Sequence, residues 1–154
     1  MVRQHYRRNV WLTNVWLTIA AGSMVMPLSA LEIQARAASD RPLTGRAGDV
    51  LRGRAIAADA RKGNCIICHA MPIPGLSADA FGDIGPSLAG VGSRRSVPAL
   101  RQRIVDPRVL SPDTVMPAYF ATTRLTRVQA AYVGKTILSA QEVEDLVAYL
   151  ASLK

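Results

Sequence analysis

Aromatic residues and cysteines are scarce in this 154-residue chain, and it has no long run of Lys or Arg. Both Trp residues lie in the first 16 positions, so residues 38–154 contain only five aromatic side chains, all Phe or Tyr. Such a domain has a thin hydrophobic core unless a large apolar group fills it. The lack of basic runs with interleaved aromatics argues against nucleic acid as a partner. No Cys precedes Cys65, which excludes a lipid anchor on a processed N-terminal cysteine.

The first part of the chain differs in composition from the rest. Three Arg residues in positions 1–9 precede an uncharged, mostly apolar run over residues 10–31, and Ala35-Arg36-Ala37 then places small residues at the spacing that a signal peptidase requires. This layout predicts a secretory signal peptide over residues 1–37, cleaved near Ala37, and a mature protein in the periplasm without membrane attachment. The alternative is an uncleaved anchor, because 22 uncharged residues can cross a hydrocarbon core of about 30 Å as a helix.

The remaining length suits a single domain. Residues 38–154 hold 15 Lys or Arg and 10 Asp or Glu, a net charge of about +5 compared with +8 for the whole chain. Much of the basic character therefore belongs to the signal segment. Residues 38–48, rich in Ala, Arg, Gly and Pro, predict a loose leader, and residues 49–154 predict the folded domain.

Helix signals recur along the folded domain, whereas strand-like alternation and internal repeats are absent from the sequence. One helix is predicted over residues 49–61, with Asp49 as its N-cap and Gly63 beyond its end. A second helix is predicted over residues 96–105. Asp106-Pro107 ends it, because proline cannot continue the hydrogen-bond ladder.

The clearest predicted helix is the last one. Ser139 and Glu142 form a capping-box pattern, and apolar residues at helical spacing then continue nearly to the C-terminus. The domain is therefore expected to be all-α, with about three to five helices joined by long loops, which are uncommon in so small a domain unless they wrap a cofactor.

The run Cys65-Ile66-Ile67-Cys68-His69 is the C-x-x-C-H haem attachment sequence. The two thiols add across the two vinyl groups of haem, and His69 is then delivered to one axial position of the iron. The alternatives are a disulfide between the cysteines, a thioredoxin-type redox pair and a zinc site. The redox pair would need a βαβ setting and zinc a fourth ligand, and residues 38–154 contain no other Cys or His. One haem c, covalently bound through Cys65 and Cys68, is therefore predicted.

The same elimination indicates the second axial ligand of the iron. Of five Met residues only Met71 and Met116 lie beyond the signal segment. Met71 is two residues from His69 and tied to the same side, whereas Met116 follows 47 residues later in a loop that can cross over. Met116 is the predicted ligand. Iron held by His and Met has a raised reduction potential and no open position for a substrate, which predicts electron transfer rather than catalysis.

Residues 52–154 resemble the small class I cytochromes c. The resemblance is carried by Gly53 and Ile56 in the first helix, the attachment motif, Gly85-Pro86, Met116-Pro117, and Tyr149 in the last helix. It implies the class I cytochrome c fold, with helices and long loops around one haem. It also implies that the carbonyl of Pro86 accepts a hydrogen bond from the ring nitrogen of His69 that does not bind iron.

A narrower resemblance is to the SoxX family, the monohaem subunits of the SoxAX cytochromes of thiosulfate-oxidising bacteria. It is carried by the strings at residues 61–64, 82–88, 114–119 and 134–142. The resemblance implies a SoxA-like cytochrome partner and membership of an L-cysteine S-thiosulfotransferase, which oxidatively links thiosulfate to a cysteine of the carrier SoxYZ. In that family catalysis belongs to SoxA, and SoxX passes the electrons on to a soluble cytochrome c.

Two other interpretations stay open. The chain could be a free-standing electron carrier that serves a terminal oxidase, or a cytochrome anchored by residues 10–31. Five Arg residues between positions 94 and 108 could dock a partner or attract thiosulfate, but a solvated helix face is the simpler expectation.

Overall fold

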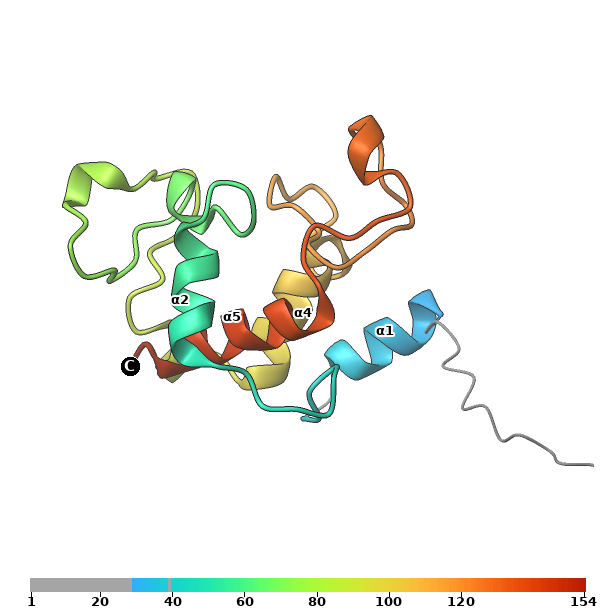
Figure 1. The fold of residues 1–154 in the computed structure, drawn as a ribbon, viewed down its shortest axis with the longest axis horizontal. Coiled ribbons are helices and arrows are strands. Elements are labelled where there is room, and N and C mark those ends of the chain that lie inside the picture. Colours follow the sequence, from blue (N-terminus) through green and yellow to red (C-terminus); the bar gives the residue numbers. More distant parts are fainter. Residues whose placement is uncertain (1–28, 39) are drawn as a thin grey trace, which may run out of the picture.

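The computed structural model describes residues 29–38 and 40–154, and over these residues it contains helices and long loops without β-strands (Figure 1). The all-α prediction is confirmed for this part of the chain. Most of the predicted signal segment, residues 1–28, lies outside the described residues. The α-helices are α1 (Ala30–Ala37), α2 (Val50–Ala58), α3 (Val91–Arg94), α4 (Val97–Val105) and α5 (Ala140–Ser152), and the short 3-10 helices are η1 (Cys65–Ile67), η2 (Ala78–Ala80), η3 (Pro107–Val109) and η4 (Ala130–Tyr132).

Side-chain caps begin the three longer helices of the domain, and two of them, at Asp49 and at Ser139 with Glu142, were predicted. The side chain of Asp49 accepts a hydrogen bond from the backbone N–H of Arg52, and that of Ser96 accepts one from Ala99. Ser139 and Glu142 form the complete capping box of α5. These contacts are local in sequence, so the residue pattern alone was sufficient to predict those of Asp49 and of the Ser139–Glu142 pair.

Helix α2 ends earlier than predicted. Its last residue is Ala58 rather than Arg61, and the backbone N–H of Gly63 donates to the carbonyl of Ile56 at 3.1 Å. The chain thus turns back against the helix end before it enters the C-x-x-C-H motif. Asn64, in the left-handed region with φ 45°, completes this turn and starts η1.

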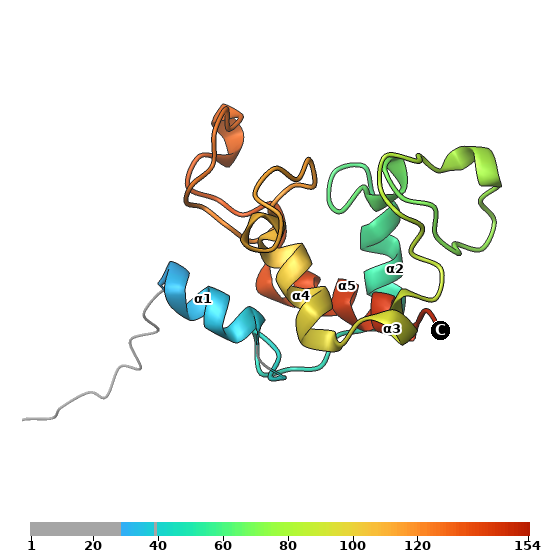
Figure 2. The same cartoon turned by 180° about the vertical axis from the view of Figure 1, so that it is seen from behind.

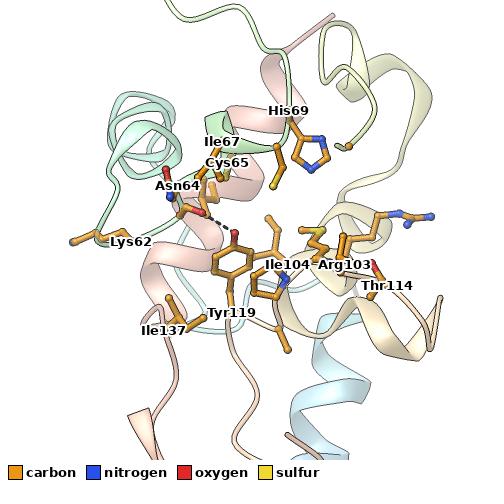
Figure 3. Close-up of a pocket in the computed structure, with 18 of the residues that line it drawn as sticks. Lys62, Asn64, Cys65, Ile67, His69, Arg103, Ile104, Thr114, Tyr119 and Ile137 are labelled. Carbon is orange, nitrogen blue, oxygen red and sulfur yellow. Dashed lines mark hydrogen bonds between the residues drawn. The ribbon is translucent and has the colours of Figure 1, made fainter. Parts of the chain in front are cut away.

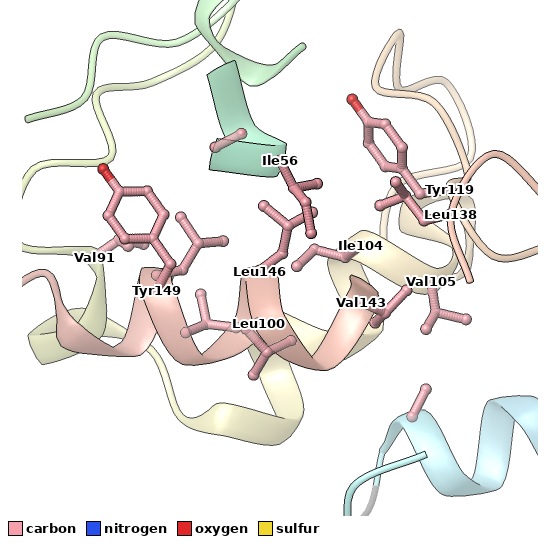
Figure 4. Close-up of a cluster of buried hydrophobic side chains, with 14 of the residues drawn as sticks. Ile56, Val91, Leu100, Ile104, Val105, Tyr119, Leu138, Val143, Leu146 and Tyr149 are labelled. Carbon is pink, nitrogen blue, oxygen red and sulfur yellow. The ribbon is translucent and has the colours of Figure 1, made fainter. Parts of the chain in front are cut away.

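Helix α5 is the centre of the fold, with α2, α3 and α4 packed against it (Figures 1 and 2). Gly53 allows the close approach of α2: a Cβ at this position would lie 1.9 Å from the carbonyl oxygen of Asp145 in α5. The apolar core between these helices includes Ile56, Leu100, Ile104 and Leu146 (Figure 4). One side of this core stays open toward the C-x-x-C-H motif.

Two of the five arginines between positions 94 and 108 do not form a solvated helix face. Arg101 is only 1% exposed, and its guanidinium donates to both carboxylate oxygens of Glu144 in α5, at 2.7 and 3.0 Å. Arg108 pairs in the same bidentate way with the buried Asp106. The expectation of a solvated surface is therefore wrong for these two residues, because each has a buried carboxylate within reach.

The predicted loose leader is fixed to the domain. The backbone N–H of Leu43 donates to Glu144 at 3.0 Å, and the Thr44 hydroxyl donates to the Gln141 side chain at 2.9 Å. Residues 40–48 have no regular helix, but these contacts hold them along α5. Before them, α1 lies against α4, and Ala37 is fully buried. No helix within the described ranges is both long enough and apolar enough to cross a membrane.

Candidate functional site

The residues of the C-x-x-C-H motif are gathered by a short turn at the end of α2. The backbone N–H of Cys68 and that of His69 both donate to the carbonyl of Cys65, at 3.2 and 2.9 Å. This turn directs Cys65, Cys68 and His69 toward one cavity (Figure 3). The two cysteines are free thiols here, so the disulfide alternative is not formed in this structure.

The cavity has a volume of about 950 Å³ and lies between the motif and the open side of the core. Its volume is near the upper end of the range for small-molecule sites, which is about 300–1,000 Å³. Apolar side chains from the core helices form its floor, namely Val91, Leu100, Ile104, Leu146 and Leu150. The thin core expected from the sequence is thus completed by whatever fills this cavity.

The orientation of His69 is set by two neighbours. Its Nδ1 lies 2.7 Å from the carbonyl oxygen of Pro86, and this oxygen can only accept, so Nδ1 carries the proton. The unprotonated Nε2 is then available to a metal. Gly85 lies against the ring, and a Cβ there would be 2.2 Å from Cε1 of His69. The contact with Pro86 that the resemblance implied is present, whereas the role of Gly85 was not expected from the sequence.

The two candidate methionines occupy different places. Met116 is partly buried and lines the cavity, on the loop that follows η3. Met71 is 5% exposed, belongs to the hydrophobic core and does not line the cavity. The structure therefore brings Met116, and not Met71, into one site with His69, Cys65 and Cys68.

Tyr119 ties the Met116 loop to both sides of the site. Its hydroxyl donates to the carbonyl of Gly63 at 2.7 Å, next to the attachment motif, and its backbone N–H donates to Ile104 of α4 at 3.1 Å (Figure 3). Burial raises the pKa of the Tyr119 hydroxyl, so it stays neutral and keeps donating. A fixed loop on this side is what a second axial ligand requires. In the sequence, Tyr119 is only one residue of the string at 114–119 that resembles the SoxX family.

Burial also raises the pKa of the Cys65 thiol, to about 11. Redox-active cysteines have the opposite property, because a lowered pKa makes the reactive thiolate available. The environment of Cys65 therefore does not suit thioredoxin-type chemistry. Within the described residues, no group of three His, Cys, Asp or Glu could hold a metal ion, so the zinc alternative has no ligand set there.

The donor set and the cavity together fit haem c. Two thiols, one imidazole and one thioether line the same cavity, and core side chains make its floor apolar. These are the groups that attach the vinyl carbons and bind the iron of a c-type cytochrome. When bound, haem supplies one-electron oxidation and reduction at its iron.

Comparisons with known proteins agree with this fit. The family model described as cytochrome c matches residues 50–154, and the chain therefore belongs to the cytochrome c family. The predictions of the class I cytochrome c fold and of covalently bound haem c are thereby confirmed.

A more particular likeness is to a chain in the crystal structure of SoxXA from P. pantotrophus. The two share 31% sequence identity with a TM-score of 0.68, over 77% of this chain and 91% of that chain. The resemblance to SoxX is confirmed by this likeness. No curated protein matches the sequence. The roles of Cys65, Cys68, His69, Met116 and Pro86 toward haem remain predictions.

Proposed function

We propose that this chain is the electron-transfer subunit of a SoxAX-type cytochrome complex in the periplasm. Its partner is a SoxA-like cytochrome subunit, and the complex is an L-cysteine S-thiosulfotransferase that oxidatively links thiosulfate to a cysteine of SoxYZ. The electrons pass through this subunit to a soluble cytochrome c. The likeness to a chain of SoxXA over 91% of that chain supports the choice of complex.

The single observation that carries the electron-transfer role is that His69 and Met116 line the same cavity from different loops. Iron held by both has no open position for a substrate. The chain also contributes no spare nucleophile, because its only two cysteines belong to the attachment motif. Catalysis on sulfur therefore belongs to the partner.

The residues of this chain hold and orient the cofactor and do not transform a substrate. Cys65 and Cys68 attach the cofactor, and the carbonyl of Pro86 keeps the His69 ring in the tautomer that binds iron. Tyr119 fixes the loop that carries Met116. The apolar floor excludes water from the site, which favours the less charged, reduced iron.

Export to the periplasm rests on the composition of residues 1–37. The burial of Ala37 constrains when the signal peptide can be cleaved, since a peptidase cannot reach that position in the folded chain. We therefore expect signal cleavage to precede folding.

Reconstitution tests the proposal. Purified holoprotein, SoxYZ, thiosulfate and a cytochrome c acceptor are mixed with and without the SoxA-like subunit, and the mass of SoxYZ is measured. We expect the thiosulfate adduct only with the partner. Adduct formation by this chain alone would refute the division of roles. Failure to bind the partner, together with efficient reduction of an oxidase, would instead establish the free-standing carrier.

A further inference from the structure

Two arginines of α4 have different surroundings. Arg101 is buried and paired with Glu144, whereas Arg103, two residues later, lines the cavity beside Ile104. Among the described residues, no carboxylate or carbonyl oxygen pairs with the Arg103 guanidinium. The helix thus presents one cation to a protein carboxylate and one to the cavity.

Arg103 also differs from the other cations around the cavity. Seven Lys or Arg residues line it and no Asp or Glu does. Six of the seven are exposed, and only Arg103 is partly buried. The Arg103 side chain is thus partly enclosed at the cavity with no protein partner for its guanidinium, which leaves the planar set of donors available to an anion that occupies the cavity.

The chemistry of haem provides that anion at a defined place. The two propionate groups of haem extend from the edge of the macrocycle opposite the vinyl groups. Cys65 and Cys68 fix the vinyl edge at the motif, so the propionates point away from it. Figure 3 shows Arg103 across the cavity from Cys65.

We infer that Arg103 binds a propionate carboxylate of the covalently attached haem. Its planar guanidinium can donate two parallel hydrogen bonds to a carboxylate, as Arg101 does to Glu144. The pair offsets the negative charge of the propionate near the iron. Oxidised iron carries one more positive charge than reduced iron, so this cation favours the reduced form and raises the reduction potential.

The test is Arg103→Gln in the full holoprotein, with Arg95→Gln as the matched control. Arg95 is also an arginine at the cavity but is exposed to solvent. In a redox titration, we expect Arg103→Gln to shift the equilibrium between reduced and oxidised protein at least tenfold toward the oxidised form, which is about 59 mV for a one-electron couple. We expect Arg95→Gln to change it less than threefold.

Resonance Raman spectroscopy gives a second readout that does not depend on charge alone. The propionate bending band should shift in Arg103→Gln and stay unchanged in Arg95→Gln. Arg103→Lys keeps the charge but loses the two parallel bonds, so it should shift the band with less than a threefold change in the redox equilibrium. If Arg103→Gln gives no holoprotein, Arg103→Lys still tests the inference through the propionate band. Equal effects of the two Gln variants, or an unshifted band in Arg103→Lys, would overturn the inference.

Discussion

Replacing Gly85 by Ala tests how the protein holds its proximal histidine. A Cβ at position 85 would lie 2.2 Å from Cε1 and 2.5 Å from Nδ1 of His69, whereas ordinary van der Waals contact begins near 3.4 Å. The imidazole would therefore have to move by about 1.2 Å. Such a movement breaks the 2.7 Å contact between Nδ1 and the Pro86 carbonyl and misaligns Nε2 with the iron.

The expected cost follows from the loss of this support. Removing the hydrogen-bond partner of a metal-binding histidine typically weakens metal binding about 10- to 100-fold, or about 1.4–2.7 kcal/mol. We expect Gly85→Ala to lower the free energy of unfolding in guanidinium by about that amount. Without denaturant, its absorption spectrum should contain a high-spin fraction that the wild type lacks.

Gly75→Ala is the control for this experiment. Gly75 has φ 84° and no atom within 4 Å of an added Cβ, so Ala there is strained but touches nothing. It should lower the free energy of unfolding by about 1–2 kcal/mol with an unchanged low-spin spectrum. A low-spin spectrum and wild-type unfolding midpoint for Gly85→Ala would refute the proposed role of this contact.

Three further predictions concern the other ligand and the buried charges. Met116→Ala should abolish the weak sulfur-to-iron absorption band while haem stays attached, and Met71→Leu should retain it at a cost below about 1.5 kcal/mol because Met71 only fills the core. Arg101→Met should destabilise the holoprotein by about 3–5 kcal/mol in a guanidinium titration, since it leaves the Glu144 carboxylate buried without its cationic partner; a loss below 1 kcal/mol, on the order of a surface pair, would contradict this. Burial disfavours the charged form of Asp145, but hydrogen bonds from Arg52, Asp49 and Gln141 outweigh it and hold the pKa of Asp145 below its ordinary value. The stability this carboxylate contributes is present above its unfolded pKa of about 3.9 and is lost as pH falls through the folded pKa, so Asp145→Asn should be less stable at pH 7 and lose less stability on acidification.

Local signals made much of the fold predictable. Asp49, Ser96 and the Ser139–Glu142 pair each act within three residues of their partner, so the printed sequence contains both members of the interaction. The attachment motif is also contiguous. Met116 was predictable for a different reason. Apart from His69 in the motif, residues 38–154 contain no His, and Met71 is the only other Met.

Long-range contacts were not predictable in this way. Arg101 and Glu144 are 43 residues apart, and nothing in either segment identifies the other as its partner. The anchoring of Leu43 to Glu144 spans 101 residues, which is why residues 38–48 were expected to be loose. The closeness of Gly85 to the His69 ring likewise depends on how the loop returns to the motif.

We propose that this chain carries electrons for a catalytic partner and does not react with thiosulfate itself. The most direct measurement follows the absorbance of the oxidised holoprotein during anaerobic mixing with thiosulfate and SoxYZ, with and without the SoxA-like subunit. We predict that the holoprotein becomes reduced only when the SoxA-like subunit is present. Reduction at the same rate and extent without that subunit would contradict it.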